Sequence, residues 1–300
     1  MNFTIKSYEP DKNFEQFQAE IYNQAVDKYG GAKVSAEGIL KRLKTHDPPQ
    51  DTNGIFFAFN ENNKPLAYIQ YRIYDKDIFI GFPWATDDCP VDVQDQLFNK
   101  MMNYVKKNHP TNDTVYIGYI MNHFTDVIDY IKQKDFEFHN SIEIYSVNTE
   151  KISKLTFSDS SYSFREASLD DVEVLVNLAL KSDLKTMGEN NLRSYFSEKV
   201  LKDGNCVLLF KENMCVASTA IIQGFYDNKE SLARYIAIHE DHLYTYKELL
   251  LYLSQYLSKK NNLLPIRINL NTKDQNDSVL NFIKMNSSLL AKESAFKKSI

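Results

Sequence analysis

Side chains suited to acid–base or metal chemistry gather in one short stretch of the chain, His239-Glu240-Asp241-His242. Imidazoles and carboxylates are common zinc ligands and common general acids and bases. No further recognisable ligands accompany this stretch, so we expect no metal. The three cysteines, Cys89, Cys206 and Cys215, lack the paired spacing of a zinc site or a disulfide framework and indicate ordinary reduced thiols.

Acidic residues crowd a second stretch, which runs from Asp87 to Asp95. Such a cluster could bind a cationic substrate. Carboxylates at the start of a helix are also stabilised by the helix dipole, without any ligand. We prefer this structural interpretation and leave the binding interpretation open.

The second half of the chain repeats the order of predicted elements in the first half. Leu97 matches Leu249 and Ile131 matches Ile283, each at a separation of 152 residues. A length of 300 residues is about twice that of a common domain, which leaves each half enough chain for its own core. The repeat therefore predicts two copies of one domain.

The expected domains are an N-terminal one over residues 1–148 and a C-terminal one over 162–300. Residues 149–161 between them are polar and serine-rich, which is typical of an exposed linker. Hydrophobic periodicity predicts the order βααβββαβαβ in the first copy. The second copy repeats this order but ends early, after a helix near Met285. The fold class is α/β, with a twisted, mostly antiparallel mixed sheet flanked by helices in each copy.

Composition and charge exclude several kinds of protein. The net charge of -5 gives no basic stripe for nucleic-acid phosphates, so bulk nucleic-acid binding is not expected. No run of eighteen apolar residues could cross a membrane. The first residues have no apolar core of signal-peptide length, so we expect a cytoplasmic protein.

Two stretches carry a resemblance to a known family. They are VIDYIKQKDFEFHNSIEIY, which ends at Tyr145, and NDSVLNFIKMNSS, which runs from Asn276 to Ser288. Together with a three-strand meander followed by helix, strand, helix and strand, they resemble the GNAT superfamily of acyl-CoA-dependent N-acetyltransferases. Tandem GNAT proteins are a known arrangement.

The resemblance implies a site for acetyl-CoA or another acyl-CoA. In the second copy it places the cofactor against the central strand near Ile236 and Ile238 and against the following loop, and it lets Asn276 orient the pantetheine arm. The loop residues concerned are Tyr244, Thr245 and Tyr246. For Asn276, helix N-capping is an equally good interpretation. In the first copy Tyr119, His123 and Tyr130 are the candidates for a catalytic proton relay, although buried aromatic residues are more often part of a core.

Both copies depart from the family pattern. The phosphate-binding loop, which normally carries glycines, reads Cys89-Pro90-Val91-Asp92-Val93-Gln94 in the first copy and Asp241-His242-Leu243-Tyr244-Thr245-Tyr246 in the second. The tyrosine that usually protonates the leaving thiolate is replaced by Ile131 and Ile283. The second loop is less acidic, so we expect the cofactor in the second copy.

Three functional hypotheses follow from these features. The first is transfer of an acetyl or other acyl group from acyl-CoA to an amine of a small molecule or a protein, by direct attack. The alternative is a non-catalytic binding or regulatory protein that kept the fold and lost the phosphate loop. Aminoacyl transfer from charged tRNA would need a cationic groove and is the weakest of the three hypotheses.

Overall fold

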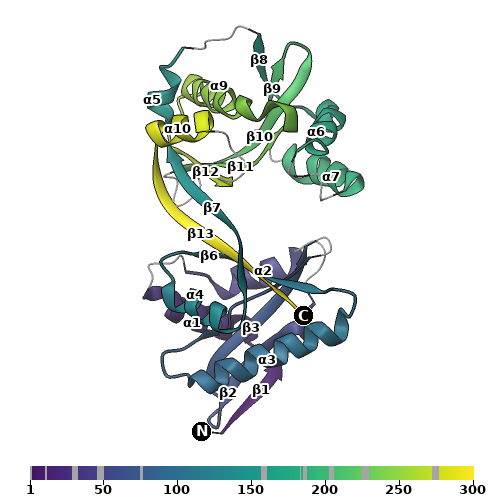
Figure 1. The fold of residues 1–300 in the computed structure, drawn as a ribbon, viewed down its shortest axis with the longest axis vertical. Helices are drawn as coiled ribbons and strands as arrows, with labels where there is room; N and C mark the ends of the chain where they lie inside the picture. The colour runs from purple at the N-terminus through teal and green to yellow at the C-terminus, as the bar shows by residue number, and fades with distance from the viewer. Residues whose placement is uncertain are drawn as a thin grey trace. The chain divides into compact units, whose positions relative to one another are not determined.

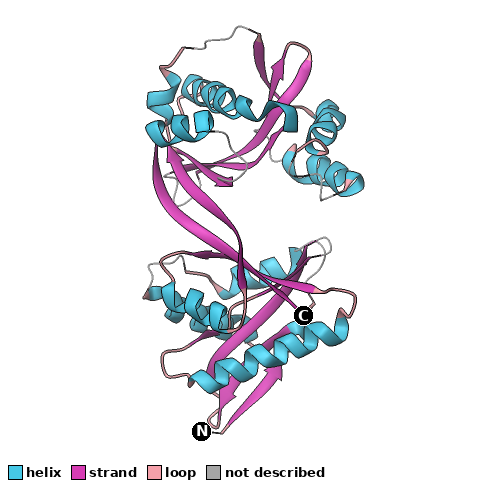
Figure 2. Ribbon diagram, viewed as in Figure 1, coloured by secondary structure: helices cyan, strands magenta, loops and turns pink. Residues whose placement is uncertain are grey.

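The computed structural model describes residues 2–10, 12–28, 33–45, 51–74, 77–156, 161–182, 184, 188–202, 206–224, 230–271 and 277–300. The chain forms two compact units. Unit 1 comprises Met1–Asn140 with Glu293–Ile300, and unit 2 comprises Ser141–Lys292. Each unit is a mixed, mostly antiparallel sheet with helices packed on it, which confirms the predicted fold class (Figures 1 and 2).

Unit 1 follows the predicted order of elements. Its strands are β1 (Phe3–Ser7), β2 (Ile55–Asn60), β3 (Pro65–Tyr74), β4 (Asp77–Ile80), β5 (Trp84–Ala85) and β6 (Thr114–Met121), and its helices are α1 (Phe14–Asp27), α2 (Ala36–Thr45), α3 (Val91–Asn108) and α4 (Thr125–Gln133), with the 3-10 turn η1 (Thr52–Gly54) before β2. The third strand of the predicted meander is divided into β4 and β5. Neighbouring strands are antiparallel except β4 and β6, which are parallel.

Unit 2 repeats this order. Its elements are α5 (Thr149–Ser153), β8 (Tyr162–Glu166), η2 (Leu169–Asp171), α6 (Val172–Ala179), α7 (Glu189–Tyr195), the π-helical turn η4 (Phe196–Val200), β9 (Cys206–Lys211), β10 (Met214–Gly224), β11 (Glu230–Ile238), η5 (Glu240–Thr245), α9 (Tyr246–Lys259), β12 (Ile266–Asn271) and α10 (Asp277–Asn286). A capping box at Ser168 opens η2 and α6. The strand order is β7-β12-β11-β10-β9-β8.

The segment expected to be an exposed linker contains the packed helix α5. Thr149 and Ile152 of this helix are buried. The Thr149 hydroxyl donates a hydrogen bond to the Leu264 carbonyl oxygen at 2.7 Å. Helix α5 therefore belongs to unit 2 and contributes to its core.

The last strand of each copy completes the sheet of the other unit. From Ile142 to Val147, β7 (Glu137–Val147) pairs antiparallel with β12 of unit 2. From Glu293 onwards, β13 (Ser287–Ser299) pairs antiparallel with β6 of unit 1. The early end expected for the second copy is therefore wrong, and the unit boundaries differ from the expected ones at both final strands.

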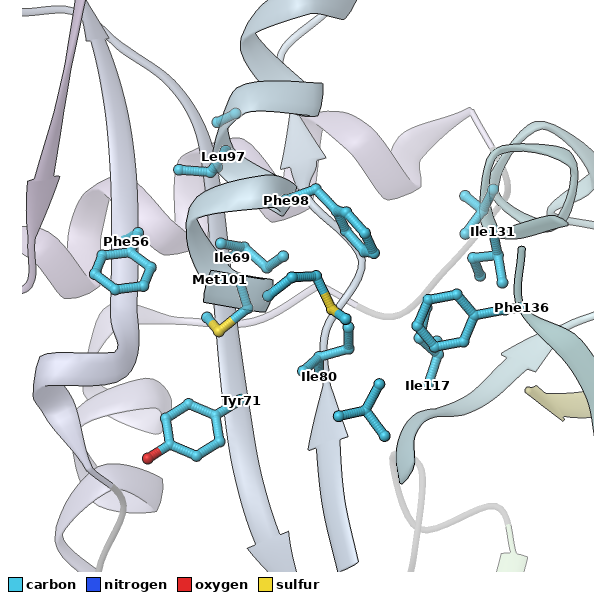
Figure 3. Packing of buried hydrophobic residues seen from close by; sticks show 14 of the residues in the cluster. Phe56, Ile69, Tyr71, Ile80, Leu97, Phe98, Met101, Ile117, Ile131 and Phe136 are labelled. Atoms are coloured by element: carbon cyan, nitrogen blue, oxygen red, sulfur yellow. The ribbon is translucent and has the colours of Figure 1, made fainter. Parts of the chain in front are cut away.

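The core of unit 1 forms where α3 lies on the sheet. The face of α3 that meets the sheet is apolar, and its residues Val93, Leu97 and Met101 are at most 1% exposed. Figure 3 shows Leu97, Phe98 and Met101 close to Ile69 and Ile80 of the strands. Burying each such side chain is worth about 1.5–3 kcal/mol.

Unit 2 buries both faces of its sheet. On one face, Leu249, Leu253 and Leu257 of α9 pack against strand residues that include Val207 and Leu209. On the other, α6, α7 and the turn that follows α7 pack against Cys206 and Leu208. The alternation of residues 206–209 between the two cores is the period-2 pattern of a strand with covered faces.

Candidate functional site

The two parallel strands of unit 1 part after a short paired stretch. Their pairing ends at Ile80↔Ile117. Beyond that point the chain pairs with β3 instead, with Trp84 opposite Tyr68. The ladder between β4 and β6 therefore opens at the carboxyl ends of the two strands, where the family resemblance places a thioester.

A one-residue bulge marks this opening. On β3 only Ile69 and Gln70 lie between the partners of Trp84 and Ile80, whereas the opposing chain has the three residues Gly81-Phe82-Pro83. The Gly81 N–H donates to the Gln70 carbonyl oxygen at 2.7 Å, so the extra residue follows Gly81. A bulge bends its strand and leaves one residue outside the ladder.

Unit 2 opens in the same way. The parallel pairing of β11 with β12 ends at Leu232↔Arg267, while β11 continues along β10 as far as Ile238↔Ala217. Over the same length β12 pairs with β7. In the described part of the chain, the second half of β11 is therefore paired with β10 on one side and with no strand on the other.

The opening in unit 2 also carries a bulge. Ala220 lies opposite Arg234 and Thr219 lies opposite Ile236, which leaves Tyr235 as the extra residue of β11. Tyr235 stands 152 residues after Pro83, the offset of the whole duplication. The bulge is therefore a repeated feature of the two units.

The two bulges differ in one backbone group. Proline has no N–H, so Pro83 cannot donate a hydrogen bond in unit 1. Its carbonyl oxygen accepts from Gln94 Nε2 at 2.9 Å. Tyr235 keeps its N–H at the matching position. The sequence analysis placed the cofactor near Ile236 and Ile238 but did not predict the bulge, for which Pro83 was the one visible signal.

The helix that follows the opening in unit 1 begins among carboxylates. Pro90 is its N-cap, and Asp92 lies in its first turn. Lys64 Nζ lies 2.6 Å from Asp88 Oδ2 and lowers the pKa of that carboxyl. A phosphate bound here would meet several negative charges, and each one within about 6 Å costs roughly 3 kcal/mol at an effective dielectric near 20 before screening.

The matching turn in unit 2 carries charges of both signs. Tyr244 is 43% exposed, and its hydroxyl lies 3.1 Å from Lys211 Nζ and 2.9 Å from His242 Nδ1. Burial and neighbouring cations lower the pKa of His242. Glu240 and Asp241 open the turn. The charges at this turn therefore repel an anion less than the carboxylates at the matching turn in unit 1 do.

The other cofactor residues expected in unit 2 lie in different surroundings. Thr245 is fully buried and donates to the His242 carbonyl oxygen at 2.7 Å, and Tyr246 is buried in the core. Ile236 is half-buried and Ile238 is buried, both on β11. Asn276 lies outside the described residues.

Several backbone donors of the turn in unit 2 have partners within the protein. The Glu240 N–H donates to the Lys181 carbonyl oxygen at 2.8 Å, and the Asp241 N–H donates to His239 Nδ1 at 3.2 Å. The His242 N–H donates to the His239 carbonyl oxygen at 2.8 Å. A phosphate bound at this turn would have to use other donors, such as the side chains of Lys211 and Lys247.

The three candidate relay residues of unit 1 do not share one pocket. Tyr130 lines a pocket between α1, β5, α3 and α4, whereas Tyr119 lines an open pocket over β3, β4 and β6. His123 is exposed at the start of α4. Ile131 and Ile283, at the positions of the missing tyrosines, are each 1% exposed and belong to the two cores. A tyrosine one position earlier, Tyr130, faces the pocket of unit 1.

Thiol and metal chemistry find little support in the described parts of the chain. Burial raises the pKa of Cys89, Cys206 and Cys215 to about 12, so none of them supplies a thiolate near neutral pH. The rings of His239 and His242 lie 5.3 Å apart. Among the described residues no three histidine, cysteine or carboxylate side chains are arranged to hold a metal ion.

Solved structures with the same fold span the whole chain. A GCN5-related N-acetyltransferase from Sphaerobacter thermophilus aligns with a TM-score of 0.74 and 10% identity over 99% of this chain and 95% of its own. A tandem GNAT protein from the clavulanic acid biosynthesis pathway aligns with a TM-score of 0.71 and 8% identity over 99% and 98%. A glucosamine N-acetyltransferase region in a fungal multi-domain β-N-acetylglucosaminidase aligns with a TM-score of 0.73 and 8% identity over 99% and 38%.

No protein-family model and no curated protein matches the chain by sequence. At identities of 8–10% the likeness to solved structures shows the fold. The chain therefore has the fold of tandem GCN5-related N-acetyltransferases, as the resemblance implied.

Proposed function

We propose that unit 2 binds an acyl-CoA and transfers its acyl group to an amine of a small molecule or a protein. The observation that carries this proposal is the bulged residue Tyr235 at the opening between β11 and β12. We assign its N–H to the negative charge that develops on a thioester oxygen, since preorganised donors of this kind are a large source of rate enhancement. Pro83 lacks this donor in unit 1.

The reaction needs little from the side chains of the protein. A deprotonated amine attacks the thioester carbonyl, a C–N bond forms and the C–S bond breaks. The thiolate leaves and takes a proton from water, since Ile283 occupies the place of the usual tyrosine, and the attacking nitrogen releases its extra proton to water. The missing general acid costs about 10² to 10⁴ in rate.

Charge also supports unit 2 as the site of the donor. Lys211 and His242 lie beside Tyr244, and Lys247 lies in the first turn of α9. In unit 1 the equivalent turn carries Asp87, Asp88 and Asp92. A cytoplasmic setting is part of the proposal, and three unpaired cysteines support it. No helix in the described ranges is long and apolar enough to span a membrane.

The second candidate is a non-catalytic binding protein with the same fold. Two observations favour it. The backbone donors of Glu240, Asp241 and His242 are already used within the protein. Both positions of the missing tyrosine are filled by buried isoleucines.

A thermal-shift titration with acetyl-CoA, longer acyl-CoAs and free CoA separates the two candidates. Ligand at 100 times the dissociation constant stabilises a folded binder by about 2.7 kcal/mol, so the unfolding midpoint should rise with concentration. Thioester consumption in the presence of a panel of amines then measures transfer. Binding without transfer would support the second candidate, and no shift at millimolar ligand would contradict acyl-CoA binding altogether.

Substitution of Tyr235 tests the role of its N–H. Tyr235→Pro removes the donor at a bulge, a position that tolerates proline, as Pro83 shows. We expect transfer to fall by roughly 10² to 10³ with the thermal shift retained. Tyr235→Ala keeps the N–H and should retain transfer. Pro83→Ala, the matched change in unit 1, should leave transfer unchanged, and equal rates in the proline and alanine variants at position 235 would rule out this role.

A further inference from the structure

Unit 1 contains a pocket that the proposed acyl transfer does not use. It has a volume of about 140 Å³ and lies between α1, β5, α3 and α4. An apolar cavity of about 150 Å³ can hold a molecule of the size of benzene. The pocket is therefore large enough for a small organic molecule.

Aromatic rings form much of the pocket wall. Phe82, Trp84 and Tyr130 line it. The ring of Phe82 meets Trp84 at 5.1 Å and Tyr130 at 5.4 Å, both edge to face. Edge-to-face packing holds the rings in fixed orientations, and aromatic faces attract cations, tryptophan most strongly.

An ammonium and a carboxylate stand together at the rim of the pocket. Lys28 Nζ lies 3.2 Å from Asp126 Oδ2, and both residues line the pocket. Their side chains are 51% and 69% exposed. An exposed pair of this kind contributes only about 0–1 kcal/mol, so another ammonium can replace Lys28 at low cost.

The surroundings disfavour an anion in this pocket. Gln94 of the lining lies two residues after Asp92, in the acidic stretch that opens α3. The one lysine of the lining is the one paired with Asp126. Pro83, beside the lining residues Phe82 and Trp84, offers no N–H to a carboxylate or a thioester oxygen.

From these contacts we infer that unit 1 is a binding site for a small organic ammonium ion with an apolar or aromatic body. Its body lies among Phe82, Trp84 and Tyr130, and its ammonium group takes the place of Lys28 beside Asp126. This site is separate from the acyl-transfer site proposed for unit 2 and does not depend on it.

The chain carries its own reporter for this pocket, because Trp84 is the only tryptophan in the sequence. Tryptophan fluorescence of the full-length protein is titrated with benzylammonium, benzyl alcohol, benzoate and CoA. We expect a saturable change with benzylammonium and binding at least about tenfold tighter than for benzoate, because the cation gains both the carboxylate and the ring faces. No saturable change with benzylammonium, or tighter binding of benzoate or CoA, would overturn the inference.

Two surface substitutions test the position of the ammonium group. Asp126→Asn should weaken benzylammonium binding by roughly threefold to fivefold and leave benzyl alcohol binding unchanged. Lys28→Ala removes the internal competitor and should strengthen benzylammonium binding. An unchanged affinity for benzylammonium in both variants, or an equal effect on benzyl alcohol, would contradict the assignment of the rim. A failure of acyl transfer in unit 2 leaves these titrations unaffected.

Discussion

The Asp171 carboxylate receives four hydrogen bonds at the start of α6. Arg165 donates from Nη1 to Oδ2 at 2.8 Å and from Nη2 to Oδ1 at 2.5 Å. The backbone N–H and the hydroxyl of Ser168 donate to Oδ2 at 2.8 and 3.1 Å. The side chain of Asp171 is 8% exposed, and the pair with Arg165 lowers its pKa to about 2.

This carboxylate makes the stability of unit 2 dependent on pH. Its pKa is lower in the folded than in the unfolded protein, so its contribution is present above about pH 4 and is lost as the pH falls toward 2. Asp171→Asn should cost about 1 to 2 kcal/mol at neutral pH, since Arg165 is half exposed and water screens the pair. Urea unfolding followed by far-ultraviolet circular dichroism measures the difference.

The neighbouring exposed residue Asp170 provides the control. Asp170→Asn should change the free energy of unfolding by less than about 0.5 kcal/mol. The difference in the free energy of unfolding between the wild type and Asp171→Asn should become smaller as the pH falls from 4 to 2. If this difference in the free energy of unfolding stays constant over the same range, the charge of Asp171 does not stabilise the fold.

The sequence showed the residue types of the candidate site but not their neighbours. Pro83 and Tyr235 can be read from the sequence, but their equivalence cannot. It depends on the bulges, which are defined by how the chain pairs with β3 in unit 1 and with β10 in unit 2. A period-2 hydrophobic pattern does not report one extra residue. Likewise, a phosphate loop was expected where Thr245 is the N-cap of α9 and Tyr246 its first residue. Both residues are buried because they lie on the side of the helix that meets the sheet.

At the scale of elements, strong periodicity was a good guide and weak periodicity was not. The helices α3 and α9 and the strands of both meanders occur in the predicted order. The strand β13 was missed, because charged residues such as Lys292, Glu293 and Lys298 interrupt its apolar residues. Its partner β6 lies more than 170 residues earlier in the sequence, so its pairing is set by the tertiary fold.

The missed strand should contribute strongly to the stability of unit 1. Phe296 on β13 is 2% exposed and belongs to the main core of unit 1. Phe296→Ala should destabilise unit 1 by about 3–5 kcal/mol, because it removes a buried ring and leaves a cavity. Urea unfolding followed by the fluorescence of Trp84, which lies in unit 1, measures the loss.

The exposed neighbour Lys297 is the matched control for this substitution. Lys297→Ala should change the stability by less than about 0.5 kcal/mol. If Phe296→Ala has as small an effect as Lys297→Ala, β13 does not complete the core of unit 1.

At the scale of the whole molecule, the duplication is plain but the division between the units is not where the repeat places it. Unit 2 is one continuous stretch, Ser141–Lys292, whereas unit 1 is made of two separated stretches. A fragment of residues 141–292 contains every strand of the unit 2 sheet, so we expect it to fold alone. A fragment of residues 162–300 lacks β7 and α5 and should fail to do so.

Circular dichroism and cooperative thermal unfolding of the two fragments check this expectation. The fragment of residues 141–292 should show a single sharp transition, and the fragment of residues 162–300 a broad one or none. The reverse result would mean that β13 completes unit 2 and that β7 belongs to unit 1.

The placement of Glu293–Ile300 in unit 1 affects how the protein folds during its synthesis on the ribosome. Domains commonly fold in the order in which they are synthesised, the N-terminal one first. Here unit 1 cannot complete its sheet until Glu293–Ile300 have left the ribosome, and until then the edge of β6 has no partner strand from these residues. All strands of unit 2 are synthesised before Glu293–Ile300, so unit 2 can complete its fold on the nascent chain before unit 1 does.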